Sequence, residues 1–177
     1  HYYGLTKQSD LWGNVVLVNG TQQLFTDRMH YDVANKIATY SSGATMTNGK
    51  TQLTSRTGEY FVEKNLTYFR GDVVVADPEF TLRSDSMSYD TKTELVFFLA
   101  PTLISQRGSK IYTEGGFYDV RNNFAEFDKN PQYERDGQRG KARRMRYDGL
   151  TKEYVLEGDA EIKEPAKDVR ADVIRYN

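Results

Sequence analysis

The 177-residue chain contains no cysteine, only two histidines and only four prolines. Without cysteine it can form neither disulfide bonds nor thiolate metal sites. His1 stands at the first position, and His30 lies beside a tyrosine and is interpreted as a surface residue. Neither histidine is in a setting typical of a zinc site or of a catalytic dyad, so we predict no metal and no cofactor.

Charge of one sign and long apolar runs are lacking too. The formal net charge is −1, which disfavours nucleic acid as a partner. No apolar run approaches the roughly 18 residues of a membrane-spanning helix. There is no phosphate-binding glycine loop. Carboxylates recur at Asp27, Asp85 and Asp172, which indicates turn or surface roles rather than one glycosidase pair. We therefore predict a protein that is not an enzyme.

Tyrosine is the residue that stands out, with 13 in the chain. Seven of them fall on one grid, whose first interval is 28 residues and whose other intervals are 29: Tyr3, Tyr31, Tyr60, Tyr89, Tyr118, Tyr147 and Tyr176. A grid of this kind indicates a structural repeat in which each unit presents the same environment to its neighbours.

Further columns follow the same period. Nine residues after each tyrosine lies a large apolar residue: Trp12, Tyr40, Phe69, Phe98, Phe127 and Leu156. Seven residues before each later tyrosine the column is mainly aliphatic: Leu24, Leu53, Leu82, Ile111, Gly140 and Val169. Five residues before, every member is small: Thr26, Ser55, Ser84, Thr113, Ala142 and Ala171.

Within a unit, short extended stretches alternate with polar turns, many opened by Asp after the tyrosine. Corners are marked by Gly13-Asn14, Gly71-Asp72 and Gly158-Asp159, and variant corners by Ala100-Pro101 and Lys129-Asn130-Pro131. No window carries the apolar spacing of a stable helix. The pattern predicts an all-β, elongated, solenoid-like stack of about six 29-residue repeats. We expect it to span residues 1–177 as one domain, either complete or as part of a longer protein.

An open stack of strands exposes unpaired edges at both ends. The grid runs from Tyr3 to Tyr176, so we expect the sheet to continue by edge-to-edge addition of another copy or of a related domain.

The apolar columns have two interpretations, a packed core or an elongated apolar groove, and the sequence leaves open which strand faces point inward. The groove candidates are Leu24, Tyr31, Leu53, Tyr60, Phe69, Leu82, Tyr89, Phe98, Ile111, Tyr118 and Phe127.

Three segments carry a resemblance to a known family: L-F-T-D-R-M-H-Y-D (24–32), L-R-S-D-S-M-S-Y-D (82–90) and V-R-A-D-V-I-R-Y-N (169–177). With the glycine corners Gly13-Asn14-Val15 and Gly71-Asp72-Val73, they resemble the repeat of the LptA/OstA-like family over nearly the whole chain. The corners at Ala100-Pro101 and Lys129-Asn130-Pro131 depart from the family pattern.

The resemblance implies an open β-jellyroll that carries lipopolysaccharide, or a related amphiphile, without catalysis. It implies a periplasmic location in a Gram-negative bacterium, with a link to the outer membrane, and partners that are other OstA-like domains joined end to end as a bridge. The acyl chains would lie in the apolar groove.

One local cluster of cations comprises Arg135, Arg139, Lys141, Arg143, Arg144 and Arg146. It is interpreted either as a solvated strand face or as a contact for lipid phosphates or an acidic partner, because arginine binds phosphate in a bidentate manner. The candidates for that contact are Arg139, Lys141, Arg143, Arg144 and Arg146.

Two other hypotheses remain open. One is a parallel β-helix that binds carbohydrate or serves as a structural interaction module. The other is a toxin-shell repeat of the Tyr-Asp type, to which Met145 to Gly149 bear a single short likeness.

Overall fold

The computed structural model describes residues 2–3 and 7–176, and these residues fold almost entirely into β-strands. The strands form one 19-stranded sheet: β1 (Tyr2–Tyr3), β2 (Gln8–Asn19), β3 (Gln22–Asp32), β4 (Ile37–Tyr40), β5 (Ala44–Thr47), β6 (Gln52–Ser55), β7 (Thr57–Phe61), β8 (Leu66–Ala76), β9 (Thr81–Asp90), β10 (Leu95–Phe98), β11 (Thr102–Gln106), β12 (Ser109–Thr113), β13 (Gly115–Asp119), β14 (Phe124–Lys129), β15 (Gln132–Arg135), β16 (Gln138–Lys141), β17 (Arg144–Asp148), β18 (Glu153–Glu164) and β19 (Lys167–Tyr176). One short 3₁₀ turn, η1 (Val62–Lys64), lies between β7 and β8.

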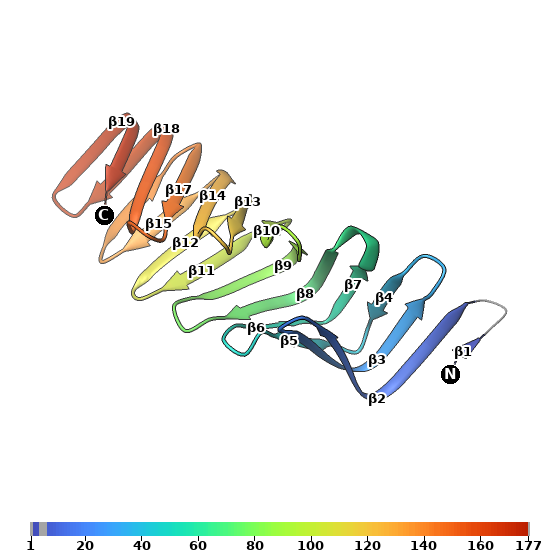
Figure 1. Ribbon diagram of the computed structural model, residues 1–177. Helices are drawn as coiled ribbons and strands as arrows, with labels where there is room; N and C mark the ends of the chain where they lie inside the picture. Colours follow the sequence, from blue (N-terminus) through green and yellow to red (C-terminus); the bar gives the residue numbers. More distant parts are fainter. Residues whose placement is uncertain (1, 4–6, 177) are drawn as a thin grey trace.

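The sheet is folded over along its middle into two arms, and Figure 1 shows the resulting elongated, twisted body with the chain ends at opposite extremes. The aromatic arm contains β4, β7, β10, β13, β14, β17 and one half of each long strand. The aliphatic arm contains β5, β6, β11, β12, β15, β16 and the other halves. The long strands β2, β3, β8, β9, β18 and β19 run through both arms. The predicted all-β, elongated open jellyroll is thus confirmed.

Every pairing among the described residues is antiparallel. The parallel β-helix considered as an alternative is therefore wrong. In this same part of the chain, no helix is long and apolar enough to cross a membrane.

Glycine corners turn the long strands from one arm to the other. Gly71 and Asp72 both have positive φ, at 75° and 48°, and the pairing of β8 with β9 shifts between Arg70 and Val73. Gly13-Asn14 and Gly158-Asp159 produce the same shift in β2 and β18. A left-handed pair of residues inserts a bulge that bends the strand, and glycine adopts that conformation without steric penalty.

Buried threonine hydroxyls form hydrogen bonds to backbone carbonyls where the sheet bends. Thr113 is fully buried, and its Oγ1 donates to the carbonyl oxygens of Gly115 at 2.5 Å and Lys129 at 3.2 Å. Thr26 Oγ1 donates likewise to the carbonyl of Gly43 at 2.7 Å. The hydroxyls of this column of small residues thus donate to backbone carbonyls where the sheet bends, which explains why the column contains Thr and Ser.

Aspartates close the turns that follow the tyrosines. The Asp90 carboxylate accepts hydrogen bonds from the backbone N–H groups of Lys92 at 2.9 Å and Thr93 at 3.0 Å. Asp119 accepts from Asn122 at 2.9 Å in the next turn. These backbone hydrogen bonds lower the pKa of both carboxyl groups, because they stabilise the charged form.

The first position of the tyrosine grid differs from the prediction. Ser9 pairs with Tyr31 on one side and with Tyr2 on the other, so Tyr2, not Tyr3, holds the grid position in the backbone register. Counting nine residues from Tyr2 leads to Leu11, which pairs with Met29. A shift of one residue reverses the face of a strand. The assignment of Trp12 to one column with Phe69, Phe98 and Phe127 is therefore wrong, because its side chain lies on the opposite strand face, where it is 55% exposed.

Candidate functional site

The inner face of the aliphatic arm carries one continuous ladder of apolar side chains. Each member pairs with the next across neighbouring strands: Leu17, Leu24, Met46, Leu53, Val75, Leu82, Ile104, Ile111, Tyr133, Gly140, Ile162 and Val169. The predicted column seven residues before each tyrosine supplies every second residue, or rung, of this ladder. The rungs between them come from the facing strand of each hairpin and were not predicted.

The inner face of the aromatic arm carries two ladders. The ladder nearer the corners includes three phenylalanines of the predicted column, Phe69, Phe98 and Phe127, which are almost fully buried. Phe98 and Phe127 stack with ring centroids 6.1 Å apart across Gly116. The ladder nearer the free edges of the arms contains the tyrosines of the grid.

An apolar cavity of about 590 Å³ lies between the two arms. All eleven predicted groove residues are on the inner faces, and eight of them border the cavity: Leu53, Phe69, Leu82, Tyr89, Phe98, Ile111, Tyr118 and Phe127. Leu24, Tyr31 and Tyr60 also face inward but pack outside its border. Whether these residues bind a lipid stays a prediction at this point.

Several bordering residues were missed by the sequence argument: Met46, Val75, Phe80, Met87, Val96, Ile104, Ala125, Tyr147 and Tyr154. For some of these residues the sequence pattern did contain a signal. Tyr147 belongs to the tyrosine grid, and Met87 lies two residues before Tyr89 on the same strand face. Ala125 and Tyr154 likewise lie two residues before a member of the aromatic column. Phe80 comes from a turn and had no such signal.

Tyrosine side chains connect the two arms across the mouth of the groove. Asn19 Nδ2 donates to the Tyr60 hydroxyl at 3.2 Å, and Gln22 Nε2 donates to the Tyr89 hydroxyl at 3.0 Å. Farther along, Phe80 meets the ring of Tyr118 edge-on with centroids 6.0 Å apart. Burial raises the pKa of Tyr89 and Tyr118, so both remain neutral donors or acceptors at physiological pH.

A polar rim borders the cavity on the aliphatic arm. The Asp77 side chain is only 7% exposed, accepts a hydrogen bond from Thr51 Oγ1 at 2.6 Å and lies 3.9 Å from Lys50 Nζ. Lys50, Glu79, Gln106 and, from the opposite arm, Lys152 also border the cavity. The groove thus combines an apolar interior with charged groups of both signs at its edge.

Most of the predicted basic cluster lies outside the groove, but Arg135 follows the inward-facing Tyr133 by two residues on β15 and shares the inner face of that strand. Because Gly140 and Met145 belong to the inner ladders, the cations next to them in sequence point outward. Each cation has an acidic neighbour: Arg135 with Asp136, Arg139 with Glu134, Lys141 with Glu161, Arg143 with Asp159, Arg144 with Glu126 and Arg146 with Glu157.

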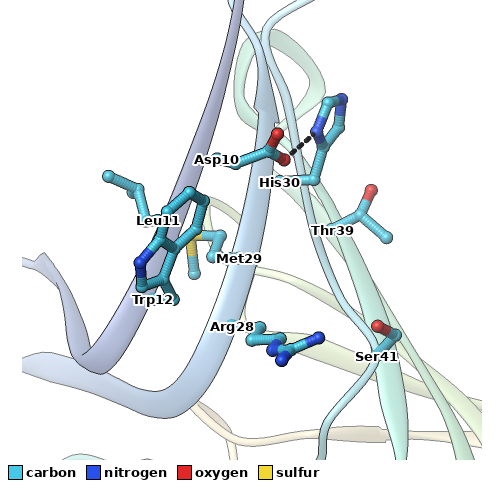
Figure 2. A pocket seen from close by; sticks show the side chains of 8 residues that line it. All are labelled: Asp10, Leu11, Trp12, Arg28, Met29, His30, Thr39 and Ser41. Carbon is cyan, nitrogen blue, oxygen red and sulfur yellow. Dashed lines mark hydrogen bonds and ion pairs between the residues drawn. The ribbon is translucent and has the colours of Figure 1, made fainter. Parts of the chain in front are cut away.

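A second recess of about 500 Å³ lies at the N-terminal end of the aromatic arm (Figure 2). The Asp10 carboxylate lies 2.8 Å from His30 Nδ1 on one side of it, and the side chains of Trp12 and Arg28 lie on the other. His30 and Asp10 are about two-fifths exposed, at 43% and 40%. Within the described ranges no group of three His, Cys, Asp or Glu residues could hold a metal ion.

Comparisons with known proteins agree on one family. Residues 1–85 match the family model of the OstA-like proteins, and residues 108–177 match that of the LptA/(LptD N-terminal domain) LPS transport proteins. A search of curated protein sequences finds no match.

Among solved structures, the fold resembles LptH, described as the LptA-homologous periplasmic component of the lipopolysaccharide transport device of Pseudomonas aeruginosa. The TM-score is 0.57 at 16% sequence identity, and the match covers 72% of this chain and 94% of LptH. At this identity the structural likeness supports the fold, and the family models add the sequence relationship. The chain therefore belongs to the LptA/OstA-like family.

Proposed function

We propose that this protein takes part in lipopolysaccharide transport by shielding the acyl chains of the lipid in the groove between its arms. The observation that supports this most directly is the apolar cavity of about 590 Å³ bordered by Phe69, Phe98 and Phe127. Its size lies within the usual range of ligand pockets, roughly 300–1,000 Å³. The family model that matches residues 108–177 is that of LPS transport proteins.

The length of the groove suits an acyl chain lying along it. From Met46 to Ile111 the aliphatic ladder crosses five strand intervals, which at about 4.8 Å each gives roughly 24 Å. One bilayer leaflet is about 15 Å deep in its hydrocarbon part. Each buried CH₂ group contributes about 0.8 kcal/mol, so a chain of about a dozen carbons is held out of water by roughly 9 kcal/mol. Shielding of this size needs no catalytic residue.

The amphiphilic nature of the ligand matches the border of the groove. Acyl chains would contact the inner ladders, while the sugar and phosphate groups would stay in solvent near Lys50 and Lys152. Lipopolysaccharide or a related amphiphile satisfies both requirements.

We propose further that the protein works in the periplasm of a Gram-negative bacterium, as part of a bridge toward the outer membrane. Strand β19 lies at the edge of the described sheet, where Leu156 pairs with Ile174 and Ile162 with Val169. Its other side pairs with no strand of the described residues, and such an edge accepts a further strand. Other OstA-like domains, or a second copy, are the proposed partners there.

Site-specific photocrosslinking to purified lipopolysaccharide tests lipid binding. A photoreactive phenylalanine analogue replaces Phe98, whose ring borders the cavity, or Lys92, which is exposed on a turn. We expect crosslinks at Phe98 and none at Lys92. Equal crosslinking at the two positions, or none at Phe98 in a protein that circular dichroism shows to be folded, would contradict the proposed groove.

The outer cations remain candidates for a second contact with phosphate or with an acidic partner. In the resting protein their charge is balanced, because Arg139, Arg143 and Arg144 each have a carboxylate within 4.0 Å. A phosphate would have to displace these carboxylates. Glu134 and Asp159 are exposed and hold their cations only weakly, whereas the Glu126 side chain is half-buried. Replacing these three arginines by glutamine should weaken binding of phosphorylated lipopolysaccharide but not of a dephosphorylated form. Equal affinities for both forms would assign the cluster to surface solvation.

A further inference from the structure

The tyrosine ladder of the aromatic arm changes its composition near the C-terminal end. Up to β14 each tyrosine pairs with a smaller residue: Ala38 between Tyr31 and Tyr60, Thr67 before Tyr89, Val96 before Tyr118, and Ala125 before Tyr147. After Tyr147 the alternation stops, because Tyr147 pairs with Tyr154 and Tyr154 pairs with Tyr176. Three large rings then follow one another on neighbouring strands.

The ladder of the aliphatic arm also changes its composition near the C-terminal end. Its ladder consists of Leu, Met, Val and Ile as far as Ile111, and the next rung is Tyr133. Tyr133 pairs with Gly140, where an added Cβ would lie 3.6 Å from the Tyr133 ring and 3.1 Å from Leu156. A glycine at this position leaves the space that the ring and Leu156 occupy. This accounts for the one glycine in an otherwise aliphatic column.

The four rings meet across the space between the arms. Tyr133 lies 5.4 Å from Tyr154 and 5.3 Å from Tyr176, measured between ring centroids. Tyr154 lies 4.5 Å from Tyr147 and 5.5 Å from Tyr176. Tyr133 and Tyr154 are only 2% and 7% exposed. We name Tyr133, Tyr147, Tyr154 and Tyr176 the tyrosine plug.

The cavity ends at the tyrosine plug. Tyr147 and Tyr154 border it, whereas Ile162, Val169 and Ile174, which continue the inner ladders toward the C-terminal end, do not. Burial raises the pKa of Tyr154 and Tyr176, in keeping with rings that are shielded from water.

We propose that the tyrosine plug is a barrier that separates the lipid-filled part of the groove from the C-terminal rungs. Rings in contact at interior packing density leave no space for an acyl chain, so a chain can pass only if the rings are displaced. Lipid in the resting protein occupies the groove on the N-terminal side of Tyr147. Onward movement along the axis requires an opening of the plug. This inference rests on the proposed function.

Two crosslinking positions on opposite sides of the plug test the barrier. A photoreactive phenylalanine analogue replaces Phe98 before the plug, or the half-buried Val169 beyond it, and each protein is irradiated with purified lipopolysaccharide. With the plug intact, we expect crosslinking at Val169 to be at least about tenfold weaker than at Phe98, because close-packed rings exclude the chain. Equal crosslinking at both positions would overturn the barrier. Loss of crosslinking at Phe98 in the folded protein would instead remove the proposed function, and this inference with it.

A double variant reports on the tyrosines themselves. Tyr133→Ile continues the aliphatic ladder, and Tyr154→Ala restores the alternation seen at Ala125. In this background crosslinking at Val169 should rise toward the level at Phe98. The matched control, Tyr154→Phe, keeps the ring and should leave crosslinking at Val169 as weak as it is with the plug intact. If crosslinking at Val169 does not rise in a folded double variant, the rings are not the barrier. If the double variant does not fold, the comparison of Phe98 with Val169 in the unsubstituted plug still tests the barrier.

Discussion

Glu161 shows how one residue on the outer surface is held by its neighbours. Its carboxylate lies 3.0 Å from Lys141 Nζ and 3.0 Å from Arg170 Nη2, and Lys163 Nζ is 3.4 Å away. Hydrogen bonds from Lys141 and Arg170 lower its pKa from 4.5 to about 2. A long cation beside a carboxylate also covers it with its hydrocarbon stem, which explains why the Glu161 side chain is only 10% exposed.

The lowered pKa of Glu161 predicts a loss of stability in acid. A carboxyl group whose pKa is depressed by folding stabilises the folded state fully above its ordinary pKa of 4.5 and progressively less as the pH falls toward about 2. Glu161→Gln should therefore reduce the loss of unfolding free energy as the pH falls from about 4.5 to about 2, which is the range between the ordinary and the lowered pKa. Urea titration at a series of pH values measures this loss. Glu153→Gln is the control, and an identical decline in both variants would contradict this role.

At the scale of elements, packing between neighbouring strands decides which residue a column tolerates. Gly58 lies between Tyr40 and Phe69 on the inner face of the aromatic arm. The Tyr40 ring covers the glycine so closely that an added Cβ would lie 2.4 Å from it. Tyr40 is 4% exposed, its hydroxyl is hydrogen-bonded to Ser55, and burial raises its pKa to about 12.

Gly58→Ala should consequently destabilise the protein. The methyl group overlaps the buried Tyr40 ring, which has no free space to move into, so we expect a loss of about 1–3 kcal/mol in the free energy of unfolding. Equilibrium denaturation measures it. Tyr40→Leu/Gly58→Ala should lose less than the sum of the two single variants, and strict additivity would show that the overlap is not the cause.

Strand parity gives a second prediction at this scale. Trp12 and Phe69 occupied one column of the sequence pattern, but Trp12 is 55% exposed and Phe69 is fully buried. Phe69→Ala should cost about 3–5 kcal/mol of stability, as is usual for a buried aromatic side chain. Trp12→Ala should cost clearly less, and comparable losses in thermal unfolding would contradict the outward placement.

For the whole molecule, the groove makes stability depend on its ligand. A ligand that binds only the folded state stabilises it by about 2.7 kcal/mol at one hundred times its Kd. For a chain of this size we therefore expect lipopolysaccharide to raise Tm by roughly 5–10 °C. Phe98→Glu should abolish this shift, because the charge lies on the apolar inner ladder, whereas Lys92→Glu should retain it. A shift of equal size in both variants would place the lipid outside the groove.

Much of the fold was predictable because it depends on local chemistry and on a period. Asp90 and Asp119 cap turns, Gly71-Asp72 bends a strand, and the 29-residue spacing aligns equivalent residues across the sheet. All eleven predicted groove residues face inward for the same reason, since columns of one period share one strand face. Trp12, which was not a groove candidate, departs from its column because the column was counted from Tyr3 although the backbone register starts at Tyr2.

The amino-acid sequence by itself determined the strands, the corners and the apolar faces, because turn chemistry and alternation act between residues close along the chain. Only the tertiary structure decided where the two arms touch and where they stay apart. Tyr133 and Tyr154 belong to different arms, and their rings meet only when the sheet folds over. Phe80 reaches Tyr118 in the same way. The extent and the end of the groove therefore depend on contacts between arms, which no periodic pattern along one strand records.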